Sequence, residues 1–199
     1  MPDNPFAPFG LEPGPAVDLA ALKGRFARET GESHPDKFQQ APDAERTAAE
    51  AHYAQLNRAY QTLIDPRARL LALYEWTKGA KPSDIQRIPP GTMDLFVEVG
   101  QACRDLDTFL EQKRVATGRL AKAGLMSQEL VLRDTLVLLR MKLETLGAML
   151  EADLQSLDQK WRSGDKDLAA LETIYRKYSY LARWRQQLEE REIALLTQE

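Results

Sequence analysis

The stretch that decides the fold runs from Ser127 to Trp161 and reads SQELVLRDTLVLLRMKLETLGAMLEADLQSLDQKW. Leucines recur in it at alternating intervals of three and four residues, namely Leu132, Leu136, Leu139, Leu143, Leu146, Leu150, Leu154 and Leu157. This spacing aligns the leucines on one side of an α-helix, and its regularity over many turns is typical of coiled-coil packing. We therefore expect a long helix over residues 127–161 whose leucines form a hydrophobic core and carry no chemistry.

Two more helical patterns flank this stretch. One covers residues 92–120 and the other residues 165–197, with a break at Ser163-Gly164-Asp165. Their expected core residues are Leu95, Val99, Ala102, Leu106 and Phe109 in the first, and Leu168, Leu171, Tyr175, Tyr178, Leu181, Leu188 and Leu195 in the second. Long helices joined by short connections predict an antiparallel three-helix bundle over residues 92–199.

The composition points to the same fold class. The chain has 29 Leu and 25 Ala but only 6 Val and 5 Ile, and strands favour β-branched residues. All 11 prolines lie in residues 1–90, so the rest of the chain is free to form uninterrupted helices. We predict an all-α protein with a first domain over residues 1–77, a Pro- and Gly-rich linker over 78–91 and the bundle over 92–199.

The first domain is expected to contain a helical hairpin with short flanking helices. A helix over residues 18–32 has Asp18 as its N-cap, with Leu19, Leu22 and Phe26 on one face. A second helix over residues 43–64 has an apolar stripe of Tyr53, Leu56, Tyr60 and Leu63. The two stripes should pack against each other. Asp65-Pro66 then starts a short helix over residues 66–77 with Leu70, Leu71, Leu73, Tyr74 and Trp76.

Charge and residue counts exclude several kinds of function. The 199 residues carry 27 basic and 30 acidic side chains, a net charge of −3, which gives no general attraction to nucleic acid or to an anionic membrane. One cysteine and two histidines leave little for a metal site and nothing for a disulfide framework. No apolar run is long enough to span a bilayer, and the N-terminus lacks the basic start of a signal peptide. We expect a cytoplasmic protein that binds no cofactor, metal, nucleic acid or membrane.

The sequence suggests no catalytic residue. His52 is expected on an exposed helix face, and Cys103 is expected to be a small buried hydrophobe. The tripeptide His34-Pro35-Asp36 differs, because proline fixes its own backbone and restricts the residue before it. The tripeptide thus holds an imidazole and a carboxylate in a limited set of directions between two packed helices. The alternative interpretation is a polar turn that ends a helix and has no function in binding.

The tripeptide and its surroundings resemble a J domain, and more specifically the HscB family of J-type co-chaperones in iron–sulfur cluster biogenesis. The matching segments are Phe6–Leu11, Arg25-Phe26, His34-Pro35-Asp36-Lys37-Phe38, Leu56–Leu63 and Asp65–Arg69. The C-terminal half matches mainly in architecture, with a local likeness at Arg176–Leu181. The resemblance implies an N-terminal J domain and a C-terminal three-helix bundle.

The resemblance also implies an activator without enzymatic activity of its own. The J domain would stimulate the ATPase of a DnaK/HscA-type chaperone, with Asp36 as the main contact. The chaperone-binding residues would be His34, Pro35, Asp36 and Lys37, with Arg28, Arg25 and Lys23 supplying a positive face. Arg28 and Lys37 are the nearest of these cations to the loop.

The bundle would hold an IscU-type scaffold protein. The positions that match the family's scaffold-binding face are Phe96, Val97, Gly100, Gln101, Arg104 and Tyr180. Gly100 replaces a leucine, and Gln101 and Arg104 replace acidic residues, so the charge of this face departs from the family's. Three alternatives remain open: a J-domain protein of this architecture with another client, a helical adaptor without chaperone activity and, as the weakest, an acid–base enzyme using His34 and Asp36.

Overall fold

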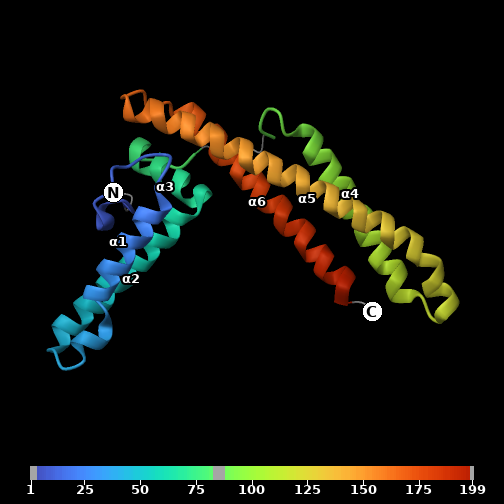
Figure 1. The fold of residues 1–199 in the computed structure, drawn as a ribbon, viewed down its shortest axis with the longest axis horizontal. Coiled ribbons are helices and arrows are strands. Elements are labelled where there is room, and N and C mark those ends of the chain that lie inside the picture. The colour runs from blue at the N-terminus through green and yellow to red at the C-terminus, as the bar shows by residue number, and fades with distance from the viewer. Residues whose placement is uncertain (1–3, 83–87, 198–199) are drawn as a thin grey trace. The chain divides into compact units, whose positions relative to one another are not determined.

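A computed structural model describes residues 4–82 and 88–197 of the chain. Within these ranges the chain is helical and has no strand, which confirms the all-α prediction. The elements are η1 (Ala7–Phe9), α1 (Leu19–Glu32), η2 (Pro35–Phe38), α2 (Asp43–Ile64), α3 (Pro66–Lys78), α4 (Met93–Val115), α5 (Arg119–Arg162) and α6 (Leu168–Thr197) (Figure 1). They form two compact units, Met1–Asp84 with Ala152–Tyr175, and Ile85–Glu151 with Arg176–Glu199.

The hairpin of α1 and α2 dominates the first unit. The Asp18 carboxylate caps α1 by accepting hydrogen bonds from the backbone amides of Ala20 and Ala21, at 2.9 and 3.0 Å. Phe26 of α1 stacks on Tyr60 of α2, with ring centroids 4.1 Å apart. The two helices therefore pack as predicted and lie side by side along their length (Figure 1).

Leu19 is the exception on the predicted face of α1. Its side chain is 52% exposed, so its assignment to the hydrophobic face was wrong. Helical side chains point back toward the N-terminus of their helix. Because Leu19 is the first residue of α1, its side chain points past the end of the helix, whereas Leu22, one turn later, is fully buried.

The third helix begins as the Asp65-Pro66 pair predicts. The Asp65 carboxylate accepts from the amides of Arg67 and Ala68 at 2.7 and 3.1 Å, and α3 runs to Lys78. Arg69 in its first turn is buried. Its guanidinium donates to the carbonyls of Pro15 and Leu63 at 2.8 and 2.5 Å, and so ties the N-terminal segment to the end of α2.

The first unit also includes the end of α5 and the start of α6. The buried carboxylate of Asp158 accepts from the amide of Ala16 at 3.1 Å and from Arg162 at 2.6 Å. Tyr74 of α3 donates to Glu172 of α6 at 3.1 Å. Packing in this unit therefore joins segments that the sequence places in different domains. The division into residues 1–77, 78–91 and 92–199 stays a prediction, and residues 83–87 of the linker lie outside the described residues.

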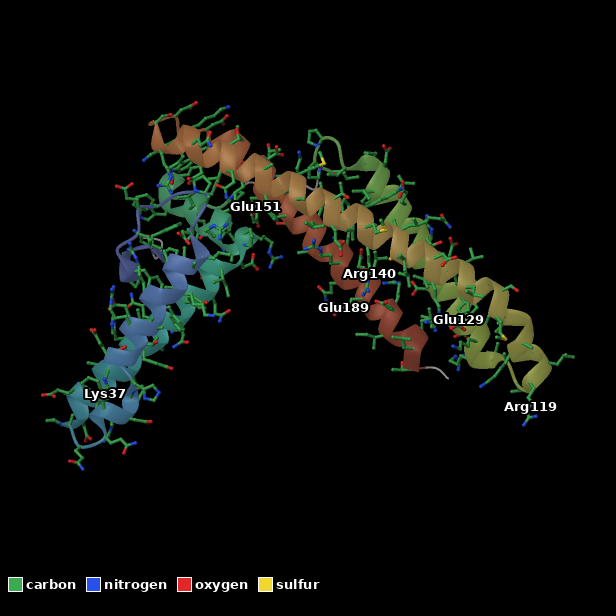
Figure 2. The ribbon with its side chains drawn as sticks, viewed as in Figure 1. Lys37, Arg119, Glu129, Arg140, Glu151 and Glu189 are labelled. Carbon is green, nitrogen blue, oxygen red and sulfur yellow. The ribbon has the colours of Figure 1, made fainter. Side chains whose placement is uncertain are left out.

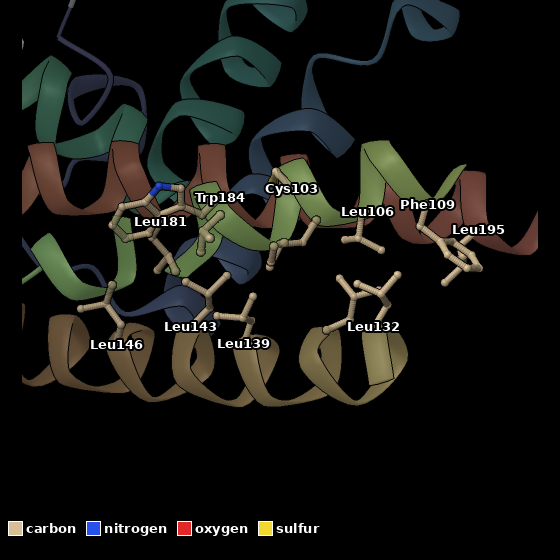
Figure 3. Packing of buried hydrophobic residues seen from close by; sticks show 14 of the residues in the cluster. Cys103, Leu106, Phe109, Leu132, Leu139, Leu143, Leu146, Leu181, Trp184 and Leu195 are labelled. Atoms are coloured by element: carbon tan, nitrogen blue, oxygen red, sulfur yellow. The ribbon is translucent and has the colours of Figure 1, made fainter. Parts of the chain in front are cut away.

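In the second unit, α4, α5 and α6 bury a common hydrophobic core (Figure 3). Every leucine predicted for the long stripe is buried, and of these Leu132 to Leu150 belong to this core. The helix α4 contributes Val99, Ala102, Cys103, Leu106 and Phe109, and α6 contributes Leu181, Trp184, Leu188 and Leu195. Trp184 is a core residue that the sequence analysis did not identify.

The turn between α4 and α5 lies earlier than predicted. The sequence predicted a helix to residue 120 and the next from residue 127, whereas α4 ends at Val115 and α5 begins at Arg119. Gly118 makes the turn with a φ of +93°, a conformation that favours glycine, and Gly124 stays inside the helix. At the next break, α6 starts at Leu168 because the Asp167 carboxylate accepts from the amides of Ala169 and Ala170.

A first prediction concerns Arg69. We expect Arg69→Met to lower the free energy of unfolding by about 2–4 kcal/mol, because it leaves two buried carbonyls without their charged donor. The exposed Arg67→Met in the same turn is the matched control and should stay within about 0.5 kcal/mol of the parent. Urea unfolding followed by circular dichroism measures both, and equal midpoints for the two variants would contradict the structural role of Arg69.

A second prediction concerns Cys103, whose thiol is buried in the bundle core. Burial raises the pKa of this thiol, so it is protonated at neutral pH and shielded from reagents. We expect Cys103 to react with a disulfide reagent at least about tenfold more slowly in the native chain than in urea. Equal rates in the two states, with the helical signal intact in the native sample, would contradict the burial of this side chain.

Candidate functional site

The His34-Pro35-Asp36 tripeptide forms a compact turn between α1 and α2. His34 has an extended backbone and precedes the 3₁₀ helix η2, in which Pro35 occupies the first position. The Nδ1 atom of His34 accepts a hydrogen bond from the amide of Asp36 at 3.3 Å, and the amide of Lys37 donates to the carbonyl of His34 at 3.0 Å. The imidazole therefore acts as the cap of the turn, a role usually taken by Ser, Asp or Asn.

The Asp36 carboxylate is the most exposed polar group of the turn. Its side chain is 74% exposed, against 46% for His34. One oxygen lies 3.5 Å from Nδ1 of His34, and the other accepts from Gln39 at 3.5 Å. The His34 ring meets the ring of Tyr53 on α2 edge-on, at 5.4 Å between centroids. Contacts on the hairpin side hold the imidazole, while the carboxylate is left open to solvent.

This arrangement suits recognition better than catalysis. An ionised carboxylate only accepts hydrogen bonds, and its two exposed oxygens can pair with both N–H groups of an arginine. A general acid or base would need a substrate pocket and a second group in reach. The part of the chain that the structure describes contains no group of three His, Cys, Asp or Glu side chains arranged to hold a metal ion.

The four predicted cations differ in their surroundings. The side chains of Lys23 and Lys37 are exposed, and neither makes a hydrogen bond or an ion pair with a described residue. Arg28 pairs with the neighbouring Glu29 at 3.2 Å. Arg25 is half-buried and donates to the carbonyls of Phe9 and Gly10 at 2.6 and 3.0 Å.

Arg25 therefore has a structural role in the first unit, since it fixes the η1 turn against α1. The two lysines are the cations whose charge is left for a partner. Figure 2 labels Lys37 at the outer end of the hairpin, beside the turn that presents Asp36. The part that all four cations play in binding stays a prediction.

The predicted scaffold-binding residues of α4 lie near its start in the second unit. Phe96 and Val97 are 42% and 57% exposed, so neither is a core residue. Met93, one turn earlier, is 54% exposed and extends the same apolar face. The sequence analysis did not single out Met93, although its position three residues before Phe96 was a signal for it.

Polar residues follow this apolar face along α4. Arg104 donates to the side-chain oxygen of Gln101 at 2.6 Å, and Gln101 donates to Asp105 at 2.8 Å. The acidic side chain of Asp105 therefore lies beside Gln101 and Arg104, the two predicted positions that have no acidic residue. At Gly100, an added Cβ would meet only the guanidinium of Arg104, at 3.6 Å, so a larger side chain would fit there.

Tyr180 on α6 is half-buried. It packs against the core of the second unit, and its ring centroid lies 5.5 Å from that of Trp184. The residue is therefore shared between core packing and the surface, whereas Phe96 lies on the surface alone.

Within the described ranges, no helix has the length and hydropathy needed to cross a bilayer.

Comparison with known proteins finds similar co-chaperones in both sequence and structure. No protein-family model matches the chain. The chain is 42% identical over 69 residues to the co-chaperone protein HscB homolog of Cupriavidus taiwanensis, and the alignment spans 35% of this chain and 39% of that relative. Its structure matches the chaperone HscB from Vibrio cholerae with a TM-score of 0.62 at 25% identity, over 97% of this chain and 99% of that one.

A second solved structure has the same fold. The human co-chaperone protein HscB matches with a TM-score of 0.61 at 19% identity, over 96% of this chain and 83% of that one. The helical architecture is thus shared over nearly the whole chain, while the sequence match to the curated relative covers little more than a third of it. The predicted resemblance is confirmed: this chain is similar to HscB co-chaperones in sequence over 69 residues and in fold over nearly its whole length.

Proposed function

We propose that this protein is a J-type co-chaperone that stimulates the ATPase of a DnaK/HscA-type chaperone through its His34-Pro35-Asp36 turn. The observation that carries the proposal is the exposed Asp36 carboxylate on a turn that His34 caps. The homology to co-chaperones suggests a regulator rather than an enzyme. The chemistry would then take place in the nucleotide site of the partner.

The geometry of the turn suggests how it would stimulate the ATPase of the chaperone. Pro35 and the imidazole cap restrict the backbone before the partner binds, so little conformational entropy is lost when Asp36 pairs with a cationic group. A contact made only in the hydrolysing state of the chaperone shifts its equilibrium toward that state. Lys23 and Lys37 would add attraction to an acidic surface beside this contact, with Arg28 contributing less because Glu29 already neutralises part of its charge.

We further propose that the second unit delivers an IscU-type scaffold for iron–sulfur cluster assembly. The exposed apolar residues Met93, Phe96 and Val97 provide a surface for a partner, and Asp105 supplies an acidic group beside Gln101 and Arg104. Tyr180 would contribute from α6. The replacement of acidic residues at Gln101 and Arg104 favours a partner surface with fewer cations than the family's usual client presents, so a different client is the second candidate.

The Asp36 contact leads to a direct prediction. We expect Asp36→Asn to reduce the stimulation of the chaperone's steady-state ATPase by at least about tenfold, because a charge-assisted hydrogen bond worth about 1.5–3 kcal/mol is lost. The variant should keep its unfolding midpoint, since the carboxylate is exposed. Glu45→Gln, another exposed acid in the first turn of α2, is the matched control and should stimulate like the parent chain. Undiminished stimulation by Asp36→Asn would exclude the proposed role of this turn.

The client surface leads to a separate prediction. We expect Phe96→Ser to weaken binding of an IscU-type scaffold by at least about tenfold, the effect of losing a well-packed interface aromatic. Val115→Ser, on an exposed residue at the far end of α4, should bind like the parent. Tyr180→Ala should also weaken binding, and its unfolding midpoint must be measured alongside because the residue packs on the core. Calorimetry on purified proteins gives the affinities.

The two measurements separate the candidate functions. If the parent chain stimulates the ATPase but binds no IscU-type scaffold, the protein is a J-domain co-chaperone with another client. If it does neither, the helical adaptor becomes the better description.

A further inference from the structure

The helix α5 begins at a free end of the second unit, where the core does not support it. Residues 117–124 are exposed without a break, and Leu125 is the first residue of α5 that packs against the core of the unit. Figure 2 labels Arg119 at this free end of the helix. We call residues 115–126 the α5 tip. Because α5 starts at Arg119, roughly one and a half turns of helix project beyond the core.

Three large apolar side chains of the α5 tip are exposed to solvent. Leu120 is 90% exposed, more than any other large hydrophobic residue that the structure describes. Val115 at the end of α4 and Met126 in α5 are 59% and 65% exposed. A leucine that hardly touches its own chain protrudes from the surface and lines no groove. The α5 tip is therefore a convex apolar feature, and its partner has to close around it.

The α5 tip is also basic. Residues 112–128 contain four basic side chains and no acidic one, although the whole chain has a net charge of −3. The two bases in α4 pair with glutamates outside this stretch. Arg119 and Lys122 are exposed, and neither makes a hydrogen bond or an ion pair with a described residue. The expectation of no membrane binding rested on the net charge, which does not describe this end of the bundle.

Arg119 and Lys122 do not stabilise the helix that carries them. Both lie in the first turn of α5, where the aligned peptide dipoles place a partial positive charge that disfavours cations. This first turn has no acidic residue, whereas the first turn of α2 has Asp43 and Glu45. The composition of the α5 tip therefore works against the stability of its own helix, which indicates a role in binding.

The arrangement of these groups fits an anionic lipid surface better than a protein pocket. Arg119, Lys122 and Met126 follow at intervals of three and four residues, so they share one side of α5. Leu120 lies about 120° around the helix from Met126, and Val115 belongs to another helix, so the apolar groups point in different directions. A single rigid pocket fits such a set poorly. Fluid lipid closes around it, and anionic headgroups attract the bases beside it.

We propose that the α5 tip docks this protein on an anionic membrane surface, with Leu120 in the interfacial region and Arg119 and Lys122 against the headgroups. The docking is peripheral and reversible. Transfer of one leucine into lipid favours binding by roughly ten- to hundredfold, and each base near an anionic surface by about fivefold. Phe96 lies about 28 Å along α4 from Val115, so the docked chain keeps its proposed client surface accessible.

Co-sedimentation of the full chain with lipid vesicles tests the proposal. We expect the chain to bind vesicles of equal parts phosphatidylcholine and phosphatidylglycerol, and to leave vesicles of phosphatidylcholine alone unbound. Raising the salt concentration from about 50 to about 500 mM should release most of the bound protein, because salt screens the attraction between the bases and the headgroups.

Leu120→Ser tests the apolar contact. This variant should bind the anionic vesicles at least about tenfold more weakly, because it removes the side chain that enters the lipid. Met149→Ser is the matched control, since Met149 is 60% exposed and lies about 40 Å further along α5. The control should bind like the parent chain, and both variants should keep the urea midpoint of the parent because both side chains are exposed.

Removal of two charges tests the basic contact. The variant with Arg119→Gln and Lys122→Gln should bind at least about tenfold more weakly. Its urea midpoint should not fall, because the change removes cations from the N-terminus of a helix. The variant with Arg67→Gln and Lys160→Gln, two exposed bases of the first unit, loses the same charge and should bind like the parent.

Three results would overturn the proposal: no binding of the parent to anionic vesicles, equal binding to anionic and neutral vesicles, or parent-like binding by either α5-tip variant. Binding of polyglutamate without binding of vesicles would also overturn it, and would assign the α5 tip to an acidic protein. None of these measurements involves the chaperone or the scaffold, so this inference and the proposed function fail separately.

Discussion

The packing of one leucine stripe on α5 is the constraint on which the rest of the structure depends. The helix is 44 residues long, and its buried leucines contribute to the second unit up to Leu150 and to the first from Leu154 onward. Isolated helices gain little stability from propensity alone, so burial of this stripe is what maintains such a length. The helices α4 and α6 supply the apolar faces that cover it in the second unit, and the N-terminal segment is tied to its end through Asp158.

Against this regular packing, the His34-Pro35-Asp36 turn is built from local contacts. A proline, an imidazole cap and one backbone hydrogen bond fix its shape, and an edge-on contact to Tyr53 attaches it to the hairpin. The Asp36 carboxylate therefore contributes little to the stability of the turn, and it is exposed to solvent. A group that the fold does not need is free to serve a partner, and this division of roles underlies the proposed co-chaperone function.

Local signals in the sequence predicted much of the fold. The bounds of α2, the caps at Asp18 and Asp65 and all eight leucines of the long stripe were predicted correctly, because each depends on neighbours within a turn or two of helix. The turn before α5 was misplaced, since Gly118 and Gly124 are equally plausible from local sequence and only the packing of α4 and α5 selects one. Arg69 and Asp158 were missed as structural residues because their partners lie far away in the chain or are backbone atoms.

The sequence by itself determined the helical class, the register of the buried leucines and the chemistry of the His34-Pro35-Asp36 turn. These follow from periodicity, from the confinement of proline to residues 1–90 and from the rigidity of one proline. Only the tertiary structure decided which apolar residues stay outside the core. Leu138 and Leu139 are adjacent leucines, yet Leu139 is buried against the other helices and Leu138 is 59% exposed. The side of α5 on which α4 and α6 pack makes that difference, because burial depends on which neighbours cover a face and not on the residue type alone.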